Sequence, residues 1–205
     1  TFLSLQGEAE AVGWPTFFIR LTGCPLRCRY CDTTYSFHGG RWQDIEDLVA
    51  AARASGARHV CVTGGEPLAQ PRCLDLLRQL CDAGLRVSLE TSGALDIAEV
   101  DPRVSRVVDL KTPASGEEGR NRYQNLDLLT PGDQLKIVLC GRADYEWARA
   151  QVRDRRLHER CQVLFSPSWG QLEPTVLADW ILEDRLPVRF QVQLHKLLWG
   201  DTPGR

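Results

Sequence analysis

Three cysteines in one short polar loop constrain this chain more than any other feature. Cys24, Cys28 and Cys31 are spaced C-x3-C-x2-C, and no fourth cysteine follows nearby. Four thiolates would complete a structural zinc site or an electron-transfer iron–sulfur site. Three thiolates leave one coordination position open for a ligand that is not protein. The simplest group that fits such a site is a 4Fe-4S cluster with one free iron. The alternative is a zinc site completed by a remote histidine such as His38, although zinc motifs usually pair two C-x2-C knuckles.

The other cysteines do not indicate a disulfide framework. They lie in apolar runs or on one face of a predicted helix, where a thiol behaves as a small buried hydrophobe. Reduced thiols in this number indicate a reducing compartment, so we expect a cytoplasmic protein. These core cysteines are Cys61, Cys73, Cys81, Cys140 and Cys161.

Length and charge narrow the class of protein. A chain of 205 residues with 43% hydrophobic and 25% charged residues fits one domain, 1–205, with a sizeable core. The net charge of −2 gives no electrostatic reason to expect a nucleic-acid or membrane-surface partner. No apolar run is long enough to span a bilayer.

Predicted strands and helices alternate, which favours an α/β fold with a mainly parallel sheet and helices outside. About six or seven strands are too few for a closed eight-fold barrel, so we expect an open, partial (β/α) barrel. Polar and glycine motifs follow the strands, and this edge builds the active site in barrel-like folds. Residues 1–8 are expected to be a short extended piece, and 114–130 a loop. Strands are predicted at 16–22, 59–63, 85–90, 106–110, 134–140, 161–165 and 188–194, and helices at 43–55, 72–83, 143–155 and 175–184.

Two further features carry chemistry. Arg20 interrupts a predicted buried strand, and a buried charge needs a partner. Arg20 either forms a salt bridge at a strand end or points its guanidinium group at a ligand carboxylate. The run Gly64-Gly65-Glu66-Pro67 is either a tight turn or a place where the backbone approaches a ligand.

The cysteine loop resembles that of the radical S-adenosylmethionine (SAM) superfamily. The resemblance implies that the SAM amino and carboxylate groups chelate the free iron, and that reduction of the cluster cleaves SAM to a 5'-deoxyadenosyl radical. It also implies that the Gly-Gly-Glu-Pro run contacts the SAM amino group, with the Glu66 carboxylate meeting the ammonium. Tyr30 and Asp32 would lie near the adenine and ribose.

Seven further stretches resemble the 7-carboxy-7-deazaguanine synthase family within that superfamily. That family converts 6-carboxy-5,6,7,8-tetrahydropterin to 7-carboxy-7-deazaguanine with loss of ammonia, in the 7-deazapurine (queuosine) pathway. The resemblance therefore implies a carbon–nitrogen lyase whose chemistry is carried by the cluster and SAM rather than by a catalytic side chain. The stretches are 4–8, Arg20, 31–33, 90–93, 109–113, 165–167 and 195–196.

The resemblance also implies roles at matching positions. Thr33 would bind Mg²⁺ through its hydroxyl, and the alternative for it is a turn cap. His195 would reach the substrate from the last strand, and the alternative is a polar residue at a strand edge. The alternative for Lys111 is a solvated strand end. Substrate contacts are expected from Leu5, Gln6, Gly7, Glu8, Arg20, Thr91 and His195. SAM contacts are expected from Tyr30, Cys31, Asp32, Gly64, Gly65, Glu66, Gly93, Lys111, Ser166, Pro167, Ser168 and Trp169.

Partners follow from the same resemblance. They are a small pterin substrate, a reductant such as flavodoxin or ferredoxin, and a second copy of the chain in a homodimer. Members of the family also use a C-terminal carboxylate on the substrate, which would fall at Arg205. Two alternatives stay open: a glycyl-radical enzyme activase with the same cysteine spacing, and an iron–sulfur electron carrier or zinc-binding module.

Overall fold

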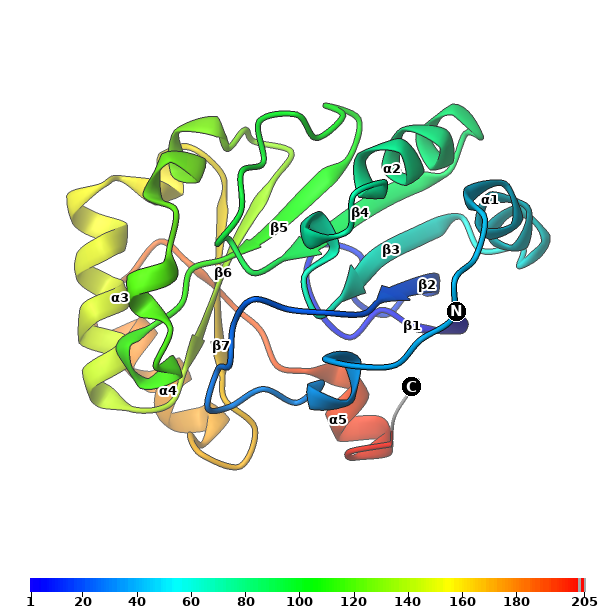
Figure 1. Ribbon diagram of the computed structural model, residues 1–205. Helices are drawn as coiled ribbons and strands as arrows, with labels where there is room; N and C mark the ends of the chain where they lie inside the picture. The colour runs from blue at the N-terminus through cyan, green and yellow to red at the C-terminus, as the bar shows by residue number, and fades with distance from the viewer. Residues whose placement is uncertain (203, 205) are drawn as a thin grey trace.

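A computed structural model describes residues 1–202 and 204, and its centre is one eight-stranded sheet with the strands in chain order. Only β1 is antiparallel to its neighbour, and all later pairs are parallel. The sheet is open (Figure 1). The strand order places β1 and β8 at its two edges. The strands are β1 (Phe2–Leu5), β2 (Pro15–Leu21), β3 (His59–Gly64), β4 (Arg86–Thr91), β5 (Ser105–Asp109), β6 (Gln134–Leu139), β7 (Gln162–Pro167) and β8 (Arg189–Phe190).

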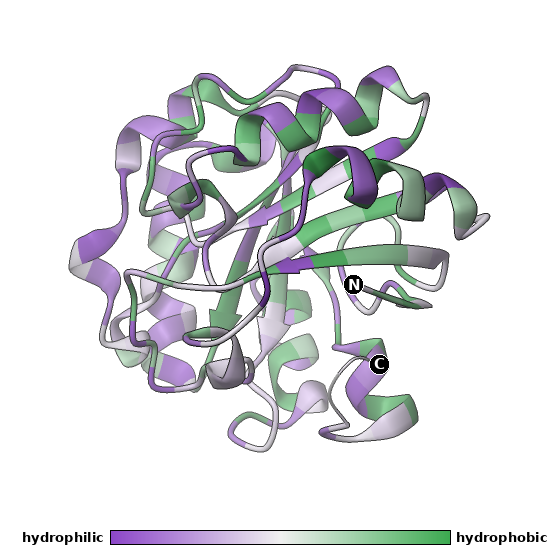
Figure 2. Cartoon of the chain, turned by 45° about the vertical axis from the view of Figure 1, so that its right-hand side comes forward, coloured by the Kyte–Doolittle hydropathy of each residue, from purple (hydrophilic) through white to green (hydrophobic). Residues whose placement is uncertain are grey.

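The helices lie outside the sheet, as expected for an open α/β barrel (Figure 1). Val60, Leu77 and Leu135 have no exposed surface and belong to the core between sheet and helices, where burial of apolar area drives folding. Figure 2 shows the strands largely green and both colours on the helices, as amphipathic helices require. The α-helices are α1 (Ile45–Ala54), α2 (Cys73–Asp82), α3 (Arg142–Asp154), α4 (Pro174–Glu183) and α5 (Leu194–Trp199). The 3-10 helices are η1 (Thr34–Ser36), η2 (Pro67–Ala69), η3 (Pro113–Ser115), η4 (Glu118–Arg120), η5 (Tyr123–Leu128) and η6 (Leu157–Glu159).

The predicted fold class is confirmed, with three corrections. The sheet has eight strands rather than six or seven. Residues 114–130, expected to be a loop, contain most of η3 and all of η4 and η5. The strand predicted at 188–194 is wrong, because β8 ends at Phe190 and α5 begins at Leu194.

Hydrogen bonds to the β1–β2 loop explain this last difference. The Gln191 side-chain oxygen accepts from the Ala9 N–H at 2.9 Å, and the Leu194 N–H donates to the Gly7 carbonyl at 2.9 Å. The chain therefore turns across the end of the sheet instead of extending along β7. As a result His195 reaches the site from a helix and not from a strand.

Parallel register brings the ends of the strands to one edge. Arg20 pairs with Thr63 across β2 and β3, and Asp109 pairs with Lys136 across β5 and β6. The loops that follow these strands therefore meet, as the sequence predicted. Within the described residues, no helix combines the length and the apolar composition needed to cross a bilayer.

Candidate functional site

A cavity of about 420 Å³ lies at the carboxyl ends of the strands, closed on one side by the cysteine loop. It brings together most of the predicted site residues. Those that line it are Glu8, Arg20, Cys24, Cys28, Tyr30, Cys31, Asp32, Thr33, Gly64, Gly65, Thr91, Lys111, Ser168, Trp169 and His195. The predicted residues outside the lining are Leu5, Gln6, Gly7, Glu66, Gly93, Ser166 and Pro167.

The cysteine loop is held open by contacts from its own backbone and from neighbouring loops. The Arg27 guanidinium donates to the Cys24 and Leu26 carbonyls at 2.7 Å each, and the Arg27 N–H donates to a Glu117 carboxylate oxygen at 2.6 Å. The Cys31 N–H donates to the Cys28 carbonyl at 3.1 Å. These bonds fix the loop before any cofactor binds, so the thiols are presented together on the cavity wall.

All three thiols are free and half-buried. Burial is the main reason why the pKa values of Cys24 and Cys28 lie above the ordinary thiol value. Among the described residues, no group of three or more His, Cys, Asp or Glu side chains is arranged to hold a single metal ion. His38, the alternative zinc ligand, is exposed and does not line the cavity. Three thiols on one wall of a larger cavity match the donor set of a multi-iron cluster that leaves one iron free.

The structure corrects the role predicted for the Glu66 side chain. Its carboxylate is fully buried and accepts hydrogen bonds from the Thr91 hydroxyl, from the Ser92 N–H and hydroxyl, and from the Leu68 N–H. It therefore ties the turn after β3 to the end of β4 and has no free oxygen for a ligand ammonium. The charge is balanced by hydrogen bonds, as a buried carboxylate requires.

The two glycines of the same run do line the cavity, and packing requires them. A Cβ on Gly64 would lie 1.9 Å from the Leu21 carbonyl oxygen, and one on Gly65 would lie 2.1 Å from the Gly23 carbonyl oxygen. Only glycine permits this close approach of the turn to the cysteine loop. The same two glycines therefore allow both the close packing of the turn and the approach of a ligand to its backbone.

We predict that Glu66→Ala destabilises the apo protein by about 3 kcal/mol or more, because several buried donors lose their acceptor. Urea unfolding followed by circular dichroism measures the change. The control is Glu99→Ala, since Glu99 is exposed and such surface changes stay within about 0.5 kcal/mol. Equal stability of the two variants would contradict the bracing role of Glu66.

Four charged side chains of alternating sign lie next to one another in the cavity lining: Glu8, Lys136, Asp109 and Lys111. The Lys136 Nζ lies 2.8 Å from Glu8 Oε2 and 3.5 Å from Asp109 Oδ1, and the Lys111 Nζ lies 2.6 Å from Asp109 Oδ2. Burial works against the charged form of both lysines, but the Asp109 carboxylate and its neighbours keep their pKa values above the ordinary range. Lys111 is thus a buried ion-pair member, and the solvated strand end is excluded.

Arg20 has no carboxylate partner among the residues that the structure describes. Its Nε is buried without a hydrogen-bond acceptor, and its guanidinium carbon lies 5.6 Å from the Phe2 ring centre and 5.7 Å from that of Tyr35. The internal salt bridge considered above is therefore not present. The aromatic rings hold a cation whose remaining hydrogen-bonding capacity faces the cavity.

Leu5, Gln6 and Gly7 support the cavity wall from behind. The Gln6 side-chain oxygen accepts from the Gly7 N–H at 2.8 Å, and its amide donates to Glu90 at 3.2 Å. A Cβ on Gly7 would lie 2.0 Å from Nδ1 of His195, so the glycine makes room for that imidazole. Burial lowers the pKa of His195. Of the predicted substrate contacts in this region, Glu8 and His195 line the cavity, and the contacts predicted for Leu5, Gln6 and Gly7 stay a prediction.

The residues around the last cysteine connect the loop to α5. Asp32 accepts from the Gln193 amide at 3.2 Å and lies 3.9 Å from the Lys196 Nζ. The Thr33 side chain makes no cap hydrogen bond to η1, and its hydroxyl lies 3.8 Å from the Cys31 sulfur. The Thr33 hydroxyl is therefore hydrogen-bonded to the Cys31 sulfur, and the turn cap is not formed by its side chain.

Gly93, Ser166 and Pro167 also lie behind the wall. Gly93 adopts a φ of +76°, and a Cβ there would lie 2.3 Å from the Asp109 carbonyl oxygen. Ser166 and Pro167 complete β7, and the chain then brings Ser168 and Trp169 to the cavity. These positions shape the wall, and their predicted SAM contacts stay a prediction.

Several lining residues were missed by the sequence analysis. Glu90 accepts a hydrogen bond from the Thr63 hydroxyl at 2.9 Å. It lies in the stretch 90–93 that resembles the family, but no role was predicted for it. Lys136 carried a usable signal, since it is a lone charge inside an apolar strand just as Arg20 is. Gln193 and Lys196 could not be placed while 188–194 was taken for a strand.

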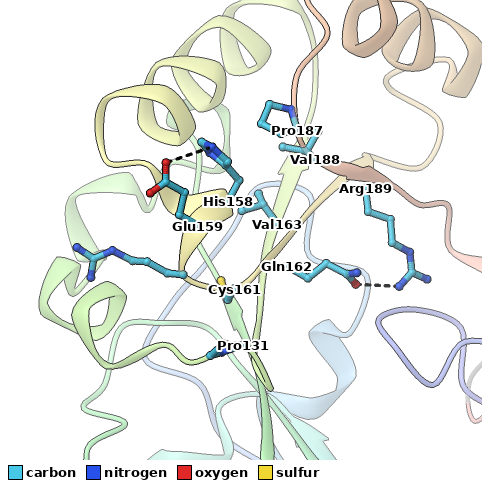
Figure 3. A pocket seen from close by; sticks show the side chains of 10 residues that line it. Pro131, His158, Glu159, Cys161, Gln162, Val163, Pro187, Val188 and Arg189 are labelled. Atoms are coloured by element: carbon cyan, nitrogen blue, oxygen red, sulfur yellow. Dashed lines mark hydrogen bonds and ion pairs between the residues drawn. The ribbon is translucent and has the colours of Figure 1, made fainter.

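A second hollow, of about 470 Å³, lies at the opposite end of the sheet, where β7 and β8 begin (Figure 3). Arg189 donates to the Gln162 side-chain oxygen at 2.9 Å, and His158 lies 3.8 Å from Glu159. Arg160 and Glu159 bond to Asp127 and Arg156 outside the hollow, and none of the predicted site residues lines it. The candidate site is therefore the cavity at the carboxyl ends.

Comparisons with known proteins agree with this geometry. Residues 18–110 match the family model described as the Radical SAM superfamily. The chain is 45% identical over 202 residues to a 7-carboxy-7-deazaguanine synthase of Chlorobaculum tepidum, covering 97% of this chain and 92% of the relative. It is 42% identical to that of Koribacter versatilis, covering 99% and 97%. Among solved structures, QueE from Escherichia coli is similar with a TM-score of 0.72, 26% identity, and coverage of 95% and 92%.

Proposed function

The chain belongs to the 7-carboxy-7-deazaguanine synthase family of radical SAM enzymes, and we propose that it converts 6-carboxy-5,6,7,8-tetrahydropterin to 7-carboxy-7-deazaguanine with release of ammonia. In this role it is a carbon–nitrogen lyase of the queuosine pathway. The observation that carries the proposal is the Arg20 guanidinium, which has no carboxylate partner among the described residues and lies in the cavity that also holds the three free thiols. One site thus combines a place for a cluster and a place for a carboxylate.

The cofactor side of the cavity is the cysteine loop and the strand ends beside it. Cys24, Cys28 and Cys31 would hold a 4Fe-4S cluster, and the cluster and SAM supply one-electron radical chemistry when bound. The backbone of Gly64 and Gly65 would approach the SAM amino acid. Tyr30, Asp32, Lys111, Ser168 and Trp169 are the further lining residues proposed to contact SAM.

The substrate side lies between β1, β2 and α5. Arg20 would pair with the pterin carboxylate through two parallel hydrogen bonds. Glu8 has one carboxylate oxygen free, and this oxygen would accept from the amino edge of the pterin. Thr91 and His195 complete the wall, and these groups together orient the substrate and exclude water.

Mg²⁺ is proposed to bind the Thr33 hydroxyl together with oxygens of the substrate carboxylate. We predict that exhaustive chelation lowers the turnover rate about tenfold or more, and that Thr33→Val raises the Mg²⁺ concentration needed for half-maximal rate about tenfold. Product formation measured against Mg²⁺ concentration tests both. Thr34→Val is the matched control, because Thr34 is exposed and outside the cavity. An unchanged rate after chelation argues against the metal site.

Further parts of the proposal rest on the family. They are a single radical SAM domain over residues 1–205, a homodimer, a flavodoxin- or ferredoxin-type reductant, and a cytoplasmic location. Arg205, the residue considered for the family's contact through a C-terminal carboxylate, lies outside the described residues.

The decisive experiment is anaerobic incubation of the reconstituted protein with SAM, dithionite, Mg²⁺ and 6-carboxytetrahydropterin, followed by mass analysis of the product. We expect 7-carboxy-7-deazaguanine and one ammonia for each pterin consumed. A glycyl-radical activase would cleave SAM without converting the pterin. An electron carrier or zinc module would leave SAM intact.

A further inference from the structure

Glu8 is held in an unusual state for a buried carboxylate. Its side chain is 9% exposed, and Oε2 lies 2.8 Å from the Lys136 Nζ, while Oε1 is buried and has no hydrogen-bond partner in the described residues. An unsatisfied buried oxygen of this kind costs free energy unless a ligand supplies a donor. The lysine engages Oε2 and leaves Oε1 as a buried acceptor without a donor among the described residues.

Lys136 is the group that holds this carboxylate in place. It is 12% exposed and lies between Glu8 and Asp109, and it forms an ion pair with each of them. The nearby Glu90 does not compete for it, because Gln6 and Thr63 donate to the two Glu90 oxygens at 3.2 and 2.9 Å. Without Lys136, Glu8 Oε2 would lose its donor as well, and no hydrogen bond among the described residues would fix the direction of the Glu8 carboxylate.

We propose that Lys136 is a positioning residue that sets ligand specificity by holding Glu8 as an acceptor-only carboxylate. A carboxylate accepts hydrogen bonds only, whereas a protonated acid can also donate one. The site therefore selects a heterocycle whose edge carries an amino group over one that carries a carbonyl oxygen there. This inference rests on the proposed pterin substrate and names the group that reads its pyrimidine edge.

Equilibrium binding of two unreactive probes tests the proposal. 6-Carboxypterin has the amino group, and 6-carboxylumazine has a carbonyl oxygen in its place. We expect the wild-type protein to bind 6-carboxypterin about 10- to 100-fold more tightly. Lys136→Met should reduce this preference to within about threefold, and Lys136→Arg, which keeps the charge, should retain most of it.

Two further variants separate positioning from general damage. Arg106→Met breaks the buried Arg106–Asp133 pair near the start of β5 and β6, outside the cavity lining, so it should lower stability without changing the preference. The double variant Glu8→Gln/Lys136→Met leaves neither charge of the pair behind, so it also tests the idea if Lys136→Met alone does not fold. If Lys136 acts through Glu8, the double variant loses no more preference than Glu8→Gln alone.

The outcomes are distinct. Equal weakening of both probes in Lys136→Met, or an unchanged preference, would overturn the role of Lys136. The proposed function is tested separately. A wild-type protein that prefers 6-carboxypterin but makes no 7-carboxy-7-deazaguanine would contradict the proposed reaction and leave the proposed role of Lys136 in specificity intact.

Discussion

Cys28→Ala is expected to abolish product formation, with activity falling by at least about a thousandfold because the radical chemistry belongs to the cofactor. Cys28 lies in the middle of the loop, and its carbonyl already accepts from the Cys31 N–H. Removing the thiol leaves two sulfur ligands, which cannot hold a cube that needs three from the protein. The anaerobically reconstituted variant should therefore lack bound iron, sulfide and the visible absorption of the cluster.

The control is Cys81→Ala. Cys81 is also a free, partly buried thiol, but it lies on α2 and does not line the cavity. This variant should keep its iron content and its turnover, so a difference between the two identifies the loop and not cysteine loss in general. A Cys28→Ala protein with a full cluster and wild-type rate would refute the ligand assignment.

Much of the architecture follows from local patterns. Val60 and Leu135 lie in short apolar runs whose strands are buried on both faces, as parallel strands covered by helices must be. The motifs after these strands then have to meet at one edge, whatever the loops do. Local patterning was sufficient here because each strand is stabilised by its own apolar residues.

The errors come from contacts between distant parts of the chain. Residues 188–194 have a strand-like pattern, but Gln191 and Leu194 bond to the β1–β2 loop and end β8 early. Glu66 looks like a ligand group until Thr91 and Ser92, about 25 residues further on, are seen to saturate its carboxylate. No window of sequence contains both partners, so only the assembled fold assigns these residues.

The different roles of Arg20 and Lys136 also depend on contacts between distant parts of the chain. Both are single cations inside apolar strands, and the sequence alone treats them alike. Lys136 pairs with Glu8 and Asp109, whereas Arg20 contacts aromatic rings and has no carboxylate partner within the part of the chain that the structure describes. A buried cation with carboxylate partners organises its surroundings, and one without them is left to bind a ligand.

Arg20→Ala is expected to lower kcat/KM for 6-carboxytetrahydropterin by about 100- to 1000-fold, since a bidentate pair with the substrate carboxylate is worth several kcal/mol. Turnover of tetrahydropterin lacking the carboxylate, or its binding if it does not react, should change by less than about threefold, because that ligand never makes the contact. Arg20→Lys should fall between the two, since an ammonium keeps the charge but not the planar fork.

The stability of the ligand-free protein distinguishes binding of the substrate carboxylate by Arg20 from a structural role of Arg20. Arg20→Ala leaves no carboxylate unpaired among the described residues and loses only the contacts of Arg20 with the Phe2 and Tyr35 rings, so it should lower the free energy of unfolding of the ligand-free protein by no more than about 2 kcal/mol. Arg86→Ala, at the start of β4 on an exposed position away from the cavity, is the control for loss of an arginine. Equal weakening of carboxylated and uncarboxylated pterins by Arg20→Ala, or a loss of stability well beyond that of the ring contacts, would mean that Arg20 supports the fold and does not bind the substrate carboxylate.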